Sequence, residues 1–516
     1  MTVLTRTRSH AAAFIGVALW LVTIAAQDVI PPASSRATTA RLGLPGIDRG
    51  LRPDAEARRV RKATDLPARR ATAGARYLPG SVIVKFRRGT PAATEAAIRT
   101  LVRGRATADL SYATFQIMAL DQDADPEGVA QRLAAQPDVE YAQARYRVQP
   151  LFTPNDPLYS LQWNFPALDM ERAWEINRGA SSEVVVAVLD TGMAYRNISF
   201  DQSSIAQTID NVFYPSLGTV HLTFAAAPEL GSADRFVAPH DFIWDDATPV
   251  DMDGHGTHVA GTIAQLTNNS VGVAGMAFNV KLMPVKVIDG FWDAYFGSPF
   301  IGTDDTIARG IHYAVDAGAK LINMSIGRTG APAPAVREAF NYAVSHGVFV
   351  AVAGGNEFLD GNPSGRFAEL APQIDGVVAV AATARDRARA SYSSTGPYIE
   401  LAAPGGDSTR SGVTGMIVQQ TYDFDFTDTF VNGATGFRPP RFDMFEYIYY
   451  QGTSMAAAHT TGLAALLLQQ GITKPAAIEA AMKAFATDLG AAGRDDQYGY
   501  GVINPRATLR GSGVVR

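Results

Sequence analysis

Three short segments of the sequence combine a carboxylate, an imidazole and a hydroxyl with glycines and other small residues. Asp190 follows the apolar run 184–189 and precedes Thr-Gly, His255 lies in Asp-Gly-His-Gly-Thr-His, and Ser454 lies in Gly-Thr-Ser-Met-Ala. A histidine that takes the proton of a serine hydroxyl, with a carboxylate to orient it, makes that serine a nucleophile for acyl transfer. These residue types are therefore the first candidates for chemistry.

Each segment alone is also compatible with a purely structural role. An Asp before Thr-Gly is common in turns, and Ser454 stands where a helix N-cap serine is expected. The pair His255 and His258 is compatible with a metal site, although a spacing of three without the glutamate of the metalloprotease pattern is a weak signal. Buried or capping histidines are the other interpretation.

The elements that must position these residues follow from the apolar pattern after residue 154. Uninterrupted apolar runs, which are typical of strands buried on both faces, alternate with helical patterns and predict an α/β fold, a parallel sheet with helices on both faces. In such a sheet the carboxyl ends of the strands gather ligands and catalytic groups, which is where Asp190 lies. We expect strands at 184–189, 281–288, 321–324, 348–352, 377–381 and 399–402, and helices at 306–317 and 335–346.

Two aromatic and turn-rich stretches, 200–250 and 406–450, interrupt this rhythm. We interpret them as surface elaborations that rim a cleft.

The N-terminal part has a different organisation. Residues 1–26, with early arginines and a short apolar run, are typical of a cleaved signal peptide, and a membrane anchor is the alternative. Residues 27–76 have the composition of a flexible basic spacer. Residues 77–150 predict a small α+β module with strands at 81–86, 112–120 and 138–141 and helices at 92–101 and 126–135, and 151–516 forms the large domain.

Composition narrows the classes of function. The chain has no cysteine, which excludes disulfides and thiolate chemistry, so an exported protein needs another means of stabilisation, for which calcium is the candidate. The first 150 residues carry 22 basic and 13 acidic side chains, whereas the remainder carries 23 and 37. An acidic main domain argues against nucleic acid as a partner.

Taken together, the three segments closely resemble the motifs of the subtilase family, in the family's order. The resemblance covers about 155–510, and 77–150 is similar to the family's inhibitory propeptide. It implies that Ser454 attacks the scissile carbonyl, that His255 moves the proton, and that Asp190 orients the imidazole. His258 is then structural.

The same resemblance extends to the groups around the nucleophile. Asn356, after the run Val-Phe-Val-Ala-Val-Ala-Gly-Gly, matches the family's oxyanion-hole asparagine, and an asparagine in a turn is the alternative. The segment Ser325-Ile326-Gly327 resembles the strand that pairs with extended substrate, and Gly354-Gly355 would form the opposite wall of the specificity pocket. Small residues there imply room for large apolar side chains and broad specificity.

One loop resembles the family's calcium site, although a plain polar turn is also possible. Its ligands would be carbonyl oxygens of the loop, an asparagine side chain and one aspartate, in the set Thr267, Asn269, Val271, Val273 and Asp201. A departure from the family is Ala458, followed by His459, where a proline is usual.

The resemblance implies a secreted serine endopeptidase that acts on polypeptides through an acyl-enzyme intermediate. It also implies a self-processing zymogen without a catalytic cofactor, whose propeptide ends in an extended tail, 139–147, that lies in the cleft. We expect a monomer without stable membrane association. An inactive scaffold protein of the same fold and a membrane-tethered processing enzyme are the alternatives.

Overall fold

The computed structural model describes residues 48–49, 77–106, 113–146, 152–209, 212–298, 302–331, 333–423 and 439–512. The predicted signal peptide lies outside these residues, as does the predicted spacer apart from Asp48–Arg49. Within the described ranges, no helix combines the length and the apolar character that crossing a membrane requires.

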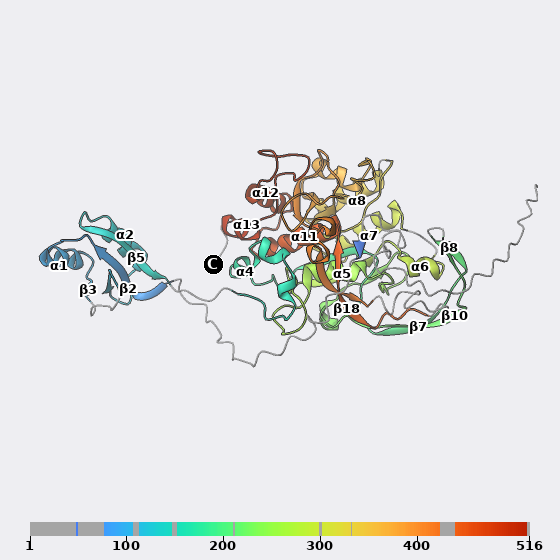
Figure 1. The fold of residues 1–516 in the computed structure, drawn as a ribbon, viewed down its shortest axis with the longest axis horizontal. Helices are drawn as coiled ribbons and strands as arrows, with labels where there is room; N and C mark the ends of the chain where they lie inside the picture. The colour runs from blue at the N-terminus through green and yellow to red at the C-terminus, as the bar shows by residue number, and fades with distance from the viewer. Residues whose placement is uncertain are drawn as a thin grey trace, which may run out of the picture.

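A seven-stranded sheet forms the centre of the larger unit (Figure 1). Its order is β11-β12-β6-β13-β14-β15-β16, and each adjacent pair is parallel. The predicted α/β class and all six predicted strands are confirmed, while the short β11 was missed. The bounds are β6 Val185–Asp190, β11 His240–Asp241, β12 Lys281–Lys286, β13 Leu321–Met324, β14 Phe349–Ala353, β15 Val377–Thr383 and β16 Leu401–Pro404.

The chain builds the sheet outwards from β6. It first adds β11 and β12 on one side and then crosses to add β13 to β16 on the other. The carboxyl end of β6 is therefore a topological switch point, where open α/β sheets bind their ligands.

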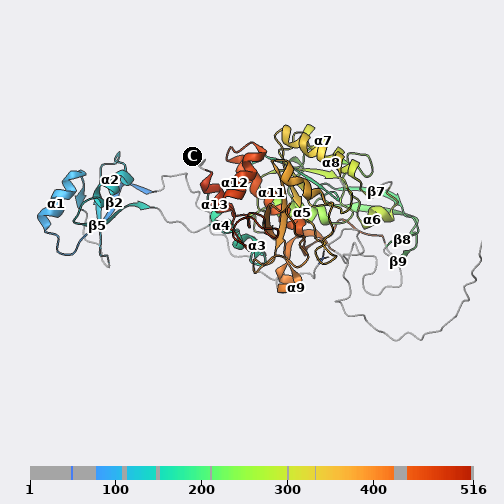
Figure 2. The ribbon, with the colours of Figure 1, turned by 90° about the horizontal axis from the view of Figure 1, so that it is seen from above.

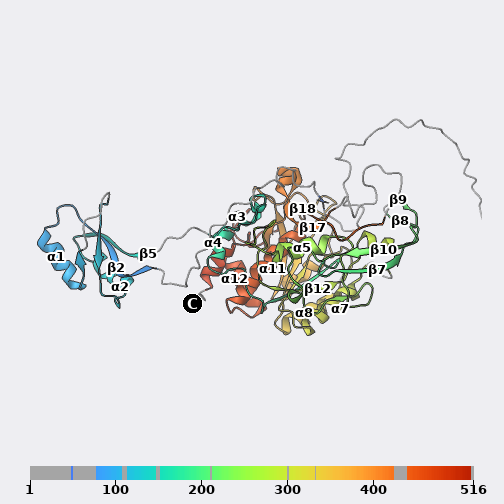
Figure 3. The ribbon, with the colours of Figure 1, turned by 90° about the horizontal axis from the view of Figure 1, so that it is seen from below.

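Helices cover both faces of this sheet (Figures 2 and 3). On one face α5, His255–Ala264, packs against α11, Thr453–Gln469, and on the other α7, Asp304–Asp316, packs against α8, Pro334–Ser345. Residues 453–467 of α11 are all buried, which explains why this helix is apolar on every side. Both predicted helices, 306–317 and 335–346, are confirmed as α7 and α8.

Further helices complete the large unit. They are η4 Tyr159–Leu161, α3 Asn164–Ala167, α4 Met170–Trp174, η5 Ala233–Arg235, α6 Phe291–Tyr295, η6 Phe367–Gln373, α9 Ser408–Ser411, η7 Val413–Gly415, α12 Pro475–Phe485 and α13 Pro505–Gly511.

The N-terminal module lies apart from the large sheet in all three views (Figures 1 to 3). Its antiparallel sheet has the order β3-β4-β2-β5, and its core joins side chains of both helices to the strands. The elements are β2 Tyr77–Phe86, α1 Ala92–Leu101, β3 Arg105–Ala106, β4 Gln116–Ala119, α2 Pro126–Ala134 and β5 Val139–Tyr146.

The extended conformation predicted for 139–147 is confirmed for 139–146, but its predicted pairing is wrong. Residues 139–146 form the edge strand β5, which pairs with β2 of the module and not with the segment Ser325–Gly327. Ala142 and Ala144 are half-buried and buried while Tyr141 and Gln143 between them are exposed, and a register shift next to Tyr141 lets Val139 join the module's core as well.

The two interrupting stretches form hairpins. Strands β7 Ile198–Ser203 and β10 Thr219–Phe224 pair in the first, with β8 Gln207–Ile209 and β9 Val212–Tyr214 between them, and β17 Ile417–Tyr422 pairs with β18 Phe445–Gln451 in the second. Asp48–Arg49, named β1, pairs with β18. The prediction of surface elaborations is wrong for β17, whose six residues are all buried, because β17 packs against α5.

Candidate active site

Asp190 ends β6, and its carboxylate contacts the imidazole of His255 at the start of α5. The distance from Asp190 Oδ1 to His255 Nδ1 is 2.6 Å, and both side chains are at most 1% exposed. A carboxylate at Nδ1 favours the tautomer that carries its proton there, so Nε2 is left unprotonated. This is the state that a general base requires.

Asp251 ties the two segments together. Its carboxylate accepts the hydroxyl of Thr191, the residue after Asp190, at 2.9 Å, and it accepts both the backbone N–H and the hydroxyl of Thr257 in α5 at 2.9 and 2.7 Å. It also accepts the N–H groups of Asp253 and Gly254 at 2.9 and 2.7 Å. One buried carboxylate thus fixes the strand end that carries Asp190 relative to the helix that begins at His255.

Ser454 lies at the second position of α11, next to the end of β13. Its hydroxyl donates to the carbonyl of Ser325 at 3.0 Å, and the Ser325 hydroxyl donates to the carbonyl of Ser454 at 2.7 Å. Asn323 holds Ser325 through a bond of 2.9 Å and itself accepts the Thr461 hydroxyl from α11 at 2.8 Å. The reciprocal bonds anchor the helix start against the strand end.

Asn356 follows β14, and its amide is oriented by Thr453. The Asn356 oxygen accepts the backbone N–H and the hydroxyl of Thr453, both at 2.9 Å, so the amide nitrogen is turned away from Thr453. A Cβ built on Gly452 would lie 3.6 Å from Asn356 Nδ2, 3.6 Å from Ser454 N and 3.7 Å from Ser454 Oγ. The Asn356 amide nitrogen, the Ser454 N–H and the serine hydroxyl therefore lie near one another beside Gly452, which is the set of groups that an oxyanion hole would need.

The sheet order brings these groups to one edge. Asp190, Ser325 and Asn356 follow β6, β13 and β14, which are neighbours in the sheet. His255 and Ser454 come from helices α5 and α11, which pack together on one face.

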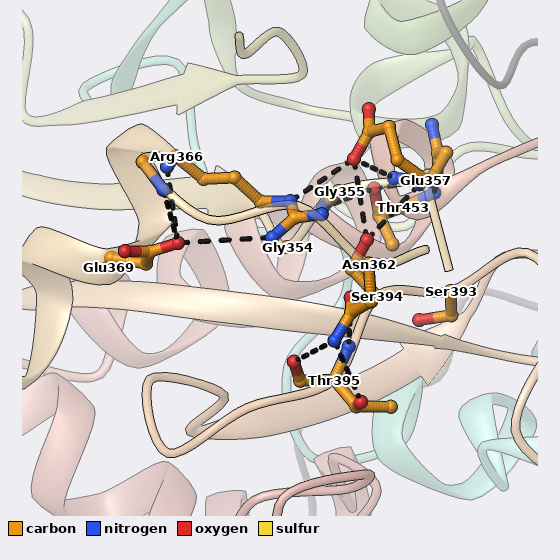
Figure 4. Close-up of polar contacts among 12 residues, drawn as sticks. Gly354, Gly355, Glu357, Asn362, Arg366, Glu369, Ser393, Ser394, Thr395 and Thr453 are labelled. Atoms are coloured by element: carbon orange, nitrogen blue, oxygen red, sulfur yellow. Dashed lines mark hydrogen bonds and ion pairs between the residues drawn. The ribbon is translucent and has the colours of Figure 1, made fainter. Parts of the chain in front are cut away.

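The predicted pocket walls are placed as follows. Ser325 and Ile326 are buried, and a Cβ on Gly327 would meet open space. A Cβ on Gly354 would meet the carbonyl of Val380, whereas Gly355 faces a side chain that sequence reasoning missed, Arg366 (Figure 4).

The loop 267–273 is held by two carboxylates, and Asp201 is not one of them. Asp156 accepts the N–H groups of Asn268 and Asn269 at 2.8 and 3.0 Å, and Glu229 accepts the N–H of Val273 at 3.3 Å. Asp201 lies in β7, exposed, where its carboxylate contacts His221 at 2.8 Å. The predicted set therefore omitted the carboxylates that contact the loop.

The predicted ligands within the loop have polar contacts of their own. The Asn269 side-chain oxygen accepts the N–H of Val271 at 2.9 Å, and the Thr267 hydroxyl accepts the N–H of Gly275 at 2.9 Å. No cluster of three or more His, Asp or Glu side chains suited to a metal occurs among the described residues.

Burial raises the pKa of both carboxylates at this loop. The pKa of Glu229 is raised to about 7, chiefly by burial and in part by the charge of Asp156, and Tyr447 and Gln265 hydrogen-bond to it. Burial also raises the pKa of Asp156. Both carboxylates accept N–H groups of the loop, and carboxylate oxygen is a donor type that a hard cation such as calcium prefers.

Two further histidines have structural surroundings. The ring of His258 stacks on Tyr450 with centroids 4.3 Å apart, and its Nε2 lies 3.1 Å from the carbonyl of Ile448. Burial lowers the pKa of His459 to about 4, so it is neutral between Met455 O and the Asn164 amide.

Comparisons with known proteins agree with this architecture. Residues 181–501 match the model of the subtilase family, and residues 63–144 match the fervidolysin N-terminal prodomain. A thermophilic serine proteinase of Bacillus sp. strain AK1 is 31% identical over 396 residues, with 77% of this chain and 79% of the relative covered. An extracellular protease of Xanthomonas campestris is 32% identical, with 76% of this chain and 62% of the relative covered.

A solved structure has the same fold. Fervidolysin from Fervidobacterium pennivorans, described as a keratinolytic enzyme related to subtilisin, aligns with a TM-score of 0.51 at 25% identity. The alignment covers 84% of this chain and 61% of the fervidolysin chain. The family model matches more than half of the chain, and the relatives are named as proteases. The chain therefore belongs to the subtilase family of serine proteases and carries a fervidolysin-like prodomain.

Proposed function

We propose that this protein is a secreted, self-processing endopeptidase whose catalytic residues are Asp190, His255, Ser454 and Asn356. The observation that carries the proposal is the grouping of Ser454 Oγ, Ser454 N and Asn356 Nδ2 beside Gly452, each within 3.7 Å of a Cβ built there. A nucleophile and two N–H donors that lie together are the groups that a tetrahedral oxyanion needs.

In the proposed mechanism the Ser454 hydroxyl turns from the Ser325 carbonyl toward His255 Nε2. His255 takes the proton as Ser454 attacks the scissile carbonyl, and it passes the proton to the leaving amine. Asp190 stabilises the imidazolium through Nδ1. The acyl-enzyme is then hydrolysed by water with the same base.

Substrate backbone would pair with the segment Ser325-Ile326-Gly327. An extended peptide that adds to an exposed strand edge is held by backbone hydrogen bonds, so its side chains alternate between the pocket and solvent. Gly327, beside open space, is compatible with close backbone approach.

A structural calcium ion would be held by Asp156 and Glu229, with oxygens of Thr267, Asn269, Val271 and Val273. The support is the pair of buried carboxylates at the loop, with the pKa of Glu229 raised to about 7. Calcium, if bound, would supply charge compensation for these two carboxylates. Since a ligand of the folded state raises stability by mass action, a chelator should lower Tm.

The module at 77–146 would act as inhibitor and folding aid, removed by the enzyme itself. The sequence predicts cleavage between about Tyr141 and Leu158, and because β5 extends to Tyr146 we expect the cleaved bond to follow that residue. The name of one relative, an extracellular protease, supports secretion.

A fluorophosphonate probe tests the proposal directly. The wild-type protein should be labelled at Ser454 and should mature to a shorter form, whereas Ser454→Ala should remain unlabelled and accumulate as the precursor. A folded wild-type protein that takes no label would be the inactive scaffold instead. Equal trimming of the Ser454→Ala precursor in a host without other proteases would exclude self-processing.

A further inference from the structure

The predicted substrate edge, residues 325–327, is held in place by side chains. β13 ends at Met324, where its pairing with β14 also stops. In the part of the chain that the structure describes, no backbone–backbone hydrogen bond involves Ile326, Gly327 or Arg328. An edge whose N–H and C=O groups are free can pair with an extended peptide, but its own backbone bonds do not fix its position.

Each end of this edge has a different anchor. At one end the Ser325 hydroxyl donates to the carbonyl of Ser454. Just beyond the other end, Arg328 forms a bidentate ion pair with Asp304, in which Nε donates to Oδ1 at 2.7 Å and Nη2 donates to Oδ2 at 2.5 Å. Arg328 Nη1 also donates to the carbonyl of Ala331 at 2.7 Å, which closes the turn that follows the edge.

The carboxylate that Arg328 contacts is itself fixed. Asp304 is the first residue of α7, and the hydroxyl of Thr306 in the same turn donates at 3.0 Å to the carbonyl of Val287, directly after β12. Because β12 and β13 are the two neighbours of β6 in the sheet, the ion pair connects both flanks of the strand that ends at Asp190. The substrate edge is therefore tied to the opposite flank of the catalytic centre.

The geometry of the pair is suited to positioning. A guanidinium that donates two parallel bonds to one carboxylate has a defined orientation, which the single contact of an ammonium group does not provide. The side chains of Arg328 and Asp304 are 32% and 31% exposed, so the pair contributes little to overall stability. Its effect is expected on Gly327, which is exposed and directly precedes the arginine.

This anchor lies away from the bond that is cleaved. Since Ser325 contacts Ser454, a peptide on this edge has its scissile carbonyl near Ser325 and extends toward Gly327. At about 3.3 Å per residue, Gly327 faces a part of the substrate that is roughly two residues further from the scissile bond. Loss of the anchor should therefore affect long substrates and leave the chemistry at Ser454 unchanged.

We infer that Arg328 is a positioning residue, which holds the substrate edge through its ion pair with Asp304 and so favours polypeptides that extend several residues before the scissile bond. This inference rests on the proposed function, since it takes Ser454 as the nucleophile and 325–327 as the substrate edge.

The test compares two substrates of the mature enzyme with the same leaving group and the same residue at the scissile carbonyl. One is an acetylated single amino acid, and the other is an acetylated tetrapeptide with uncharged side chains. Arg328→Met should lower kcat/KM for the tetrapeptide by about fivefold to tenfold, the equivalent of roughly one backbone hydrogen bond. For the single amino acid the change should stay below about twofold, because that substrate does not reach Gly327.

Three further variants sharpen the comparison. Asp304→Asn removes the charge of the partner and should give the same selective loss, and the double variant should lose no more than either single change. Arg410→Met is the matched control, because Arg410 forms a bidentate pair with Asp386 between α9 and the turn after β15. It should leave kcat/KM for both substrates unchanged.

Fluorophosphonate labelling of each protein separates the two possible failures. An unlabelled wild type would overturn the proposed function. A labelled Arg328→Met protein whose kcat/KM falls equally for both substrates, or for neither, would overturn only the role of Arg328. If Arg328→Met does not fold, Asp304→Asn permits the same comparison, and an equal effect of Asp304→Asn on both substrates would likewise overturn that role.

Discussion

Asp251 at the catalytic edge and Glu229 at the loop 267–273 are both buried carboxylates, but different parts of the chain stabilise them. Asp251 accepts five hydrogen bonds, four of them from residues within the next six positions of the chain. Glu229 accepts donors from distant segments, namely the side chains of Gln265, Gln420 and Tyr447 and the backbone N–H of Val273, and its pKa is raised to about 7.

The difference indicates separate tasks for the two regions. A carboxylate surrounded by local N–H groups needs no counter-ion, so the edge that carries Asp190 and His255 is rigid without a ligand. A carboxylate with a raised pKa is stabilised by a proton or a cation, so the loop makes stability depend on the solution. Changes at the edge should therefore affect rate, and changes at the loop should affect stability.

The largest expected effect is on rate alone. Ser454→Ala, freed of its prodomain by an added protease so that it matches mature wild type, should lower kcat by about 10⁶, a factor taken from subtilisin, a member of the same family, and leave Tm unchanged. Peptide hydrolysis and thermal unfolding measure the two quantities. Ser345→Ala, at a hydroxyl on α8 that bonds only locally, is the matched control. A large fall in Tm for Ser454→Ala would contradict the expectation that changes at the catalytic edge affect rate and not stability.

A smaller loss of rate is expected at Asn356. Asn356→Leu removes one oxyanion donor, which costs roughly 10²–10³ in kcat, again a value from subtilisin, with little change in KM. Because the Asn356 oxygen accepts two bonds from Thr453, a modest loss of stability should accompany it. Steady-state kinetics that show an unchanged kcat would refute the role of this amide.

At the loop the expected effect is on stability and depends on pH. The pKa of Glu229 is about 7 in the folded protein and 4.5 as the reference value, so the folded state binds the proton more tightly. The contribution of Glu229 to the free energy of unfolding is fully present below pH 4.5. It is lost as pH rises through 7, by about 3 kcal/mol in all. Glu229→Gln cannot ionise and should lose this dependence.

Urea unfolding at pH 5 and pH 8 with chelator, in the Ser454→Ala background, measures this difference. Excess calcium should flatten the wild-type dependence, since the ion binds the ionised carboxylate. If the protein with Glu229→Gln shows the same pH dependence as the protein that keeps Glu229, this carboxyl is not the responsible group.

The sequence predicted the parts of the molecule that are encoded locally. The strand ending at Asp190 and the helices at 306–317 and 335–346 followed from apolar periodicity, and the site motifs are short and contiguous. Neither Asp156, just before the large domain's first elements, nor Glu229, in the stretch 200–250, lies in a site motif. Arg366 was missed because its contact with Gly355 depends on the path of the chain between them, which no local pattern describes.

The smallest expected effect concerns the departure at Ala458. A proline inside a helix costs about 3 kcal/mol, because it removes an N–H and its ring crowds the carbonyl four residues earlier. Here that carbonyl belongs to Ser454 and already accepts the Ser325 hydroxyl at 2.7 Å, and the next carbonyl, of Met455, lies 2.7 Å from His459 Nδ1. Side chains thus already occupy the backbone acceptors that a proline would disturb.

We therefore expect Ala458→Pro to change the free energy of unfolding by only about 1 kcal/mol, with kcat/KM for peptides within a factor of about two. The matched control is Ala464→Pro, at a buried position two turns later in α11, which should cost about 3 kcal/mol or more. Urea unfolding of both variants in the Ser454→Ala background gives the comparison. If both prolines lower the free energy of unfolding equally, the side-chain bonds to the first turn of α11 do not compensate for the lost backbone bond. The start of this helix would then be as intolerant of proline as its interior.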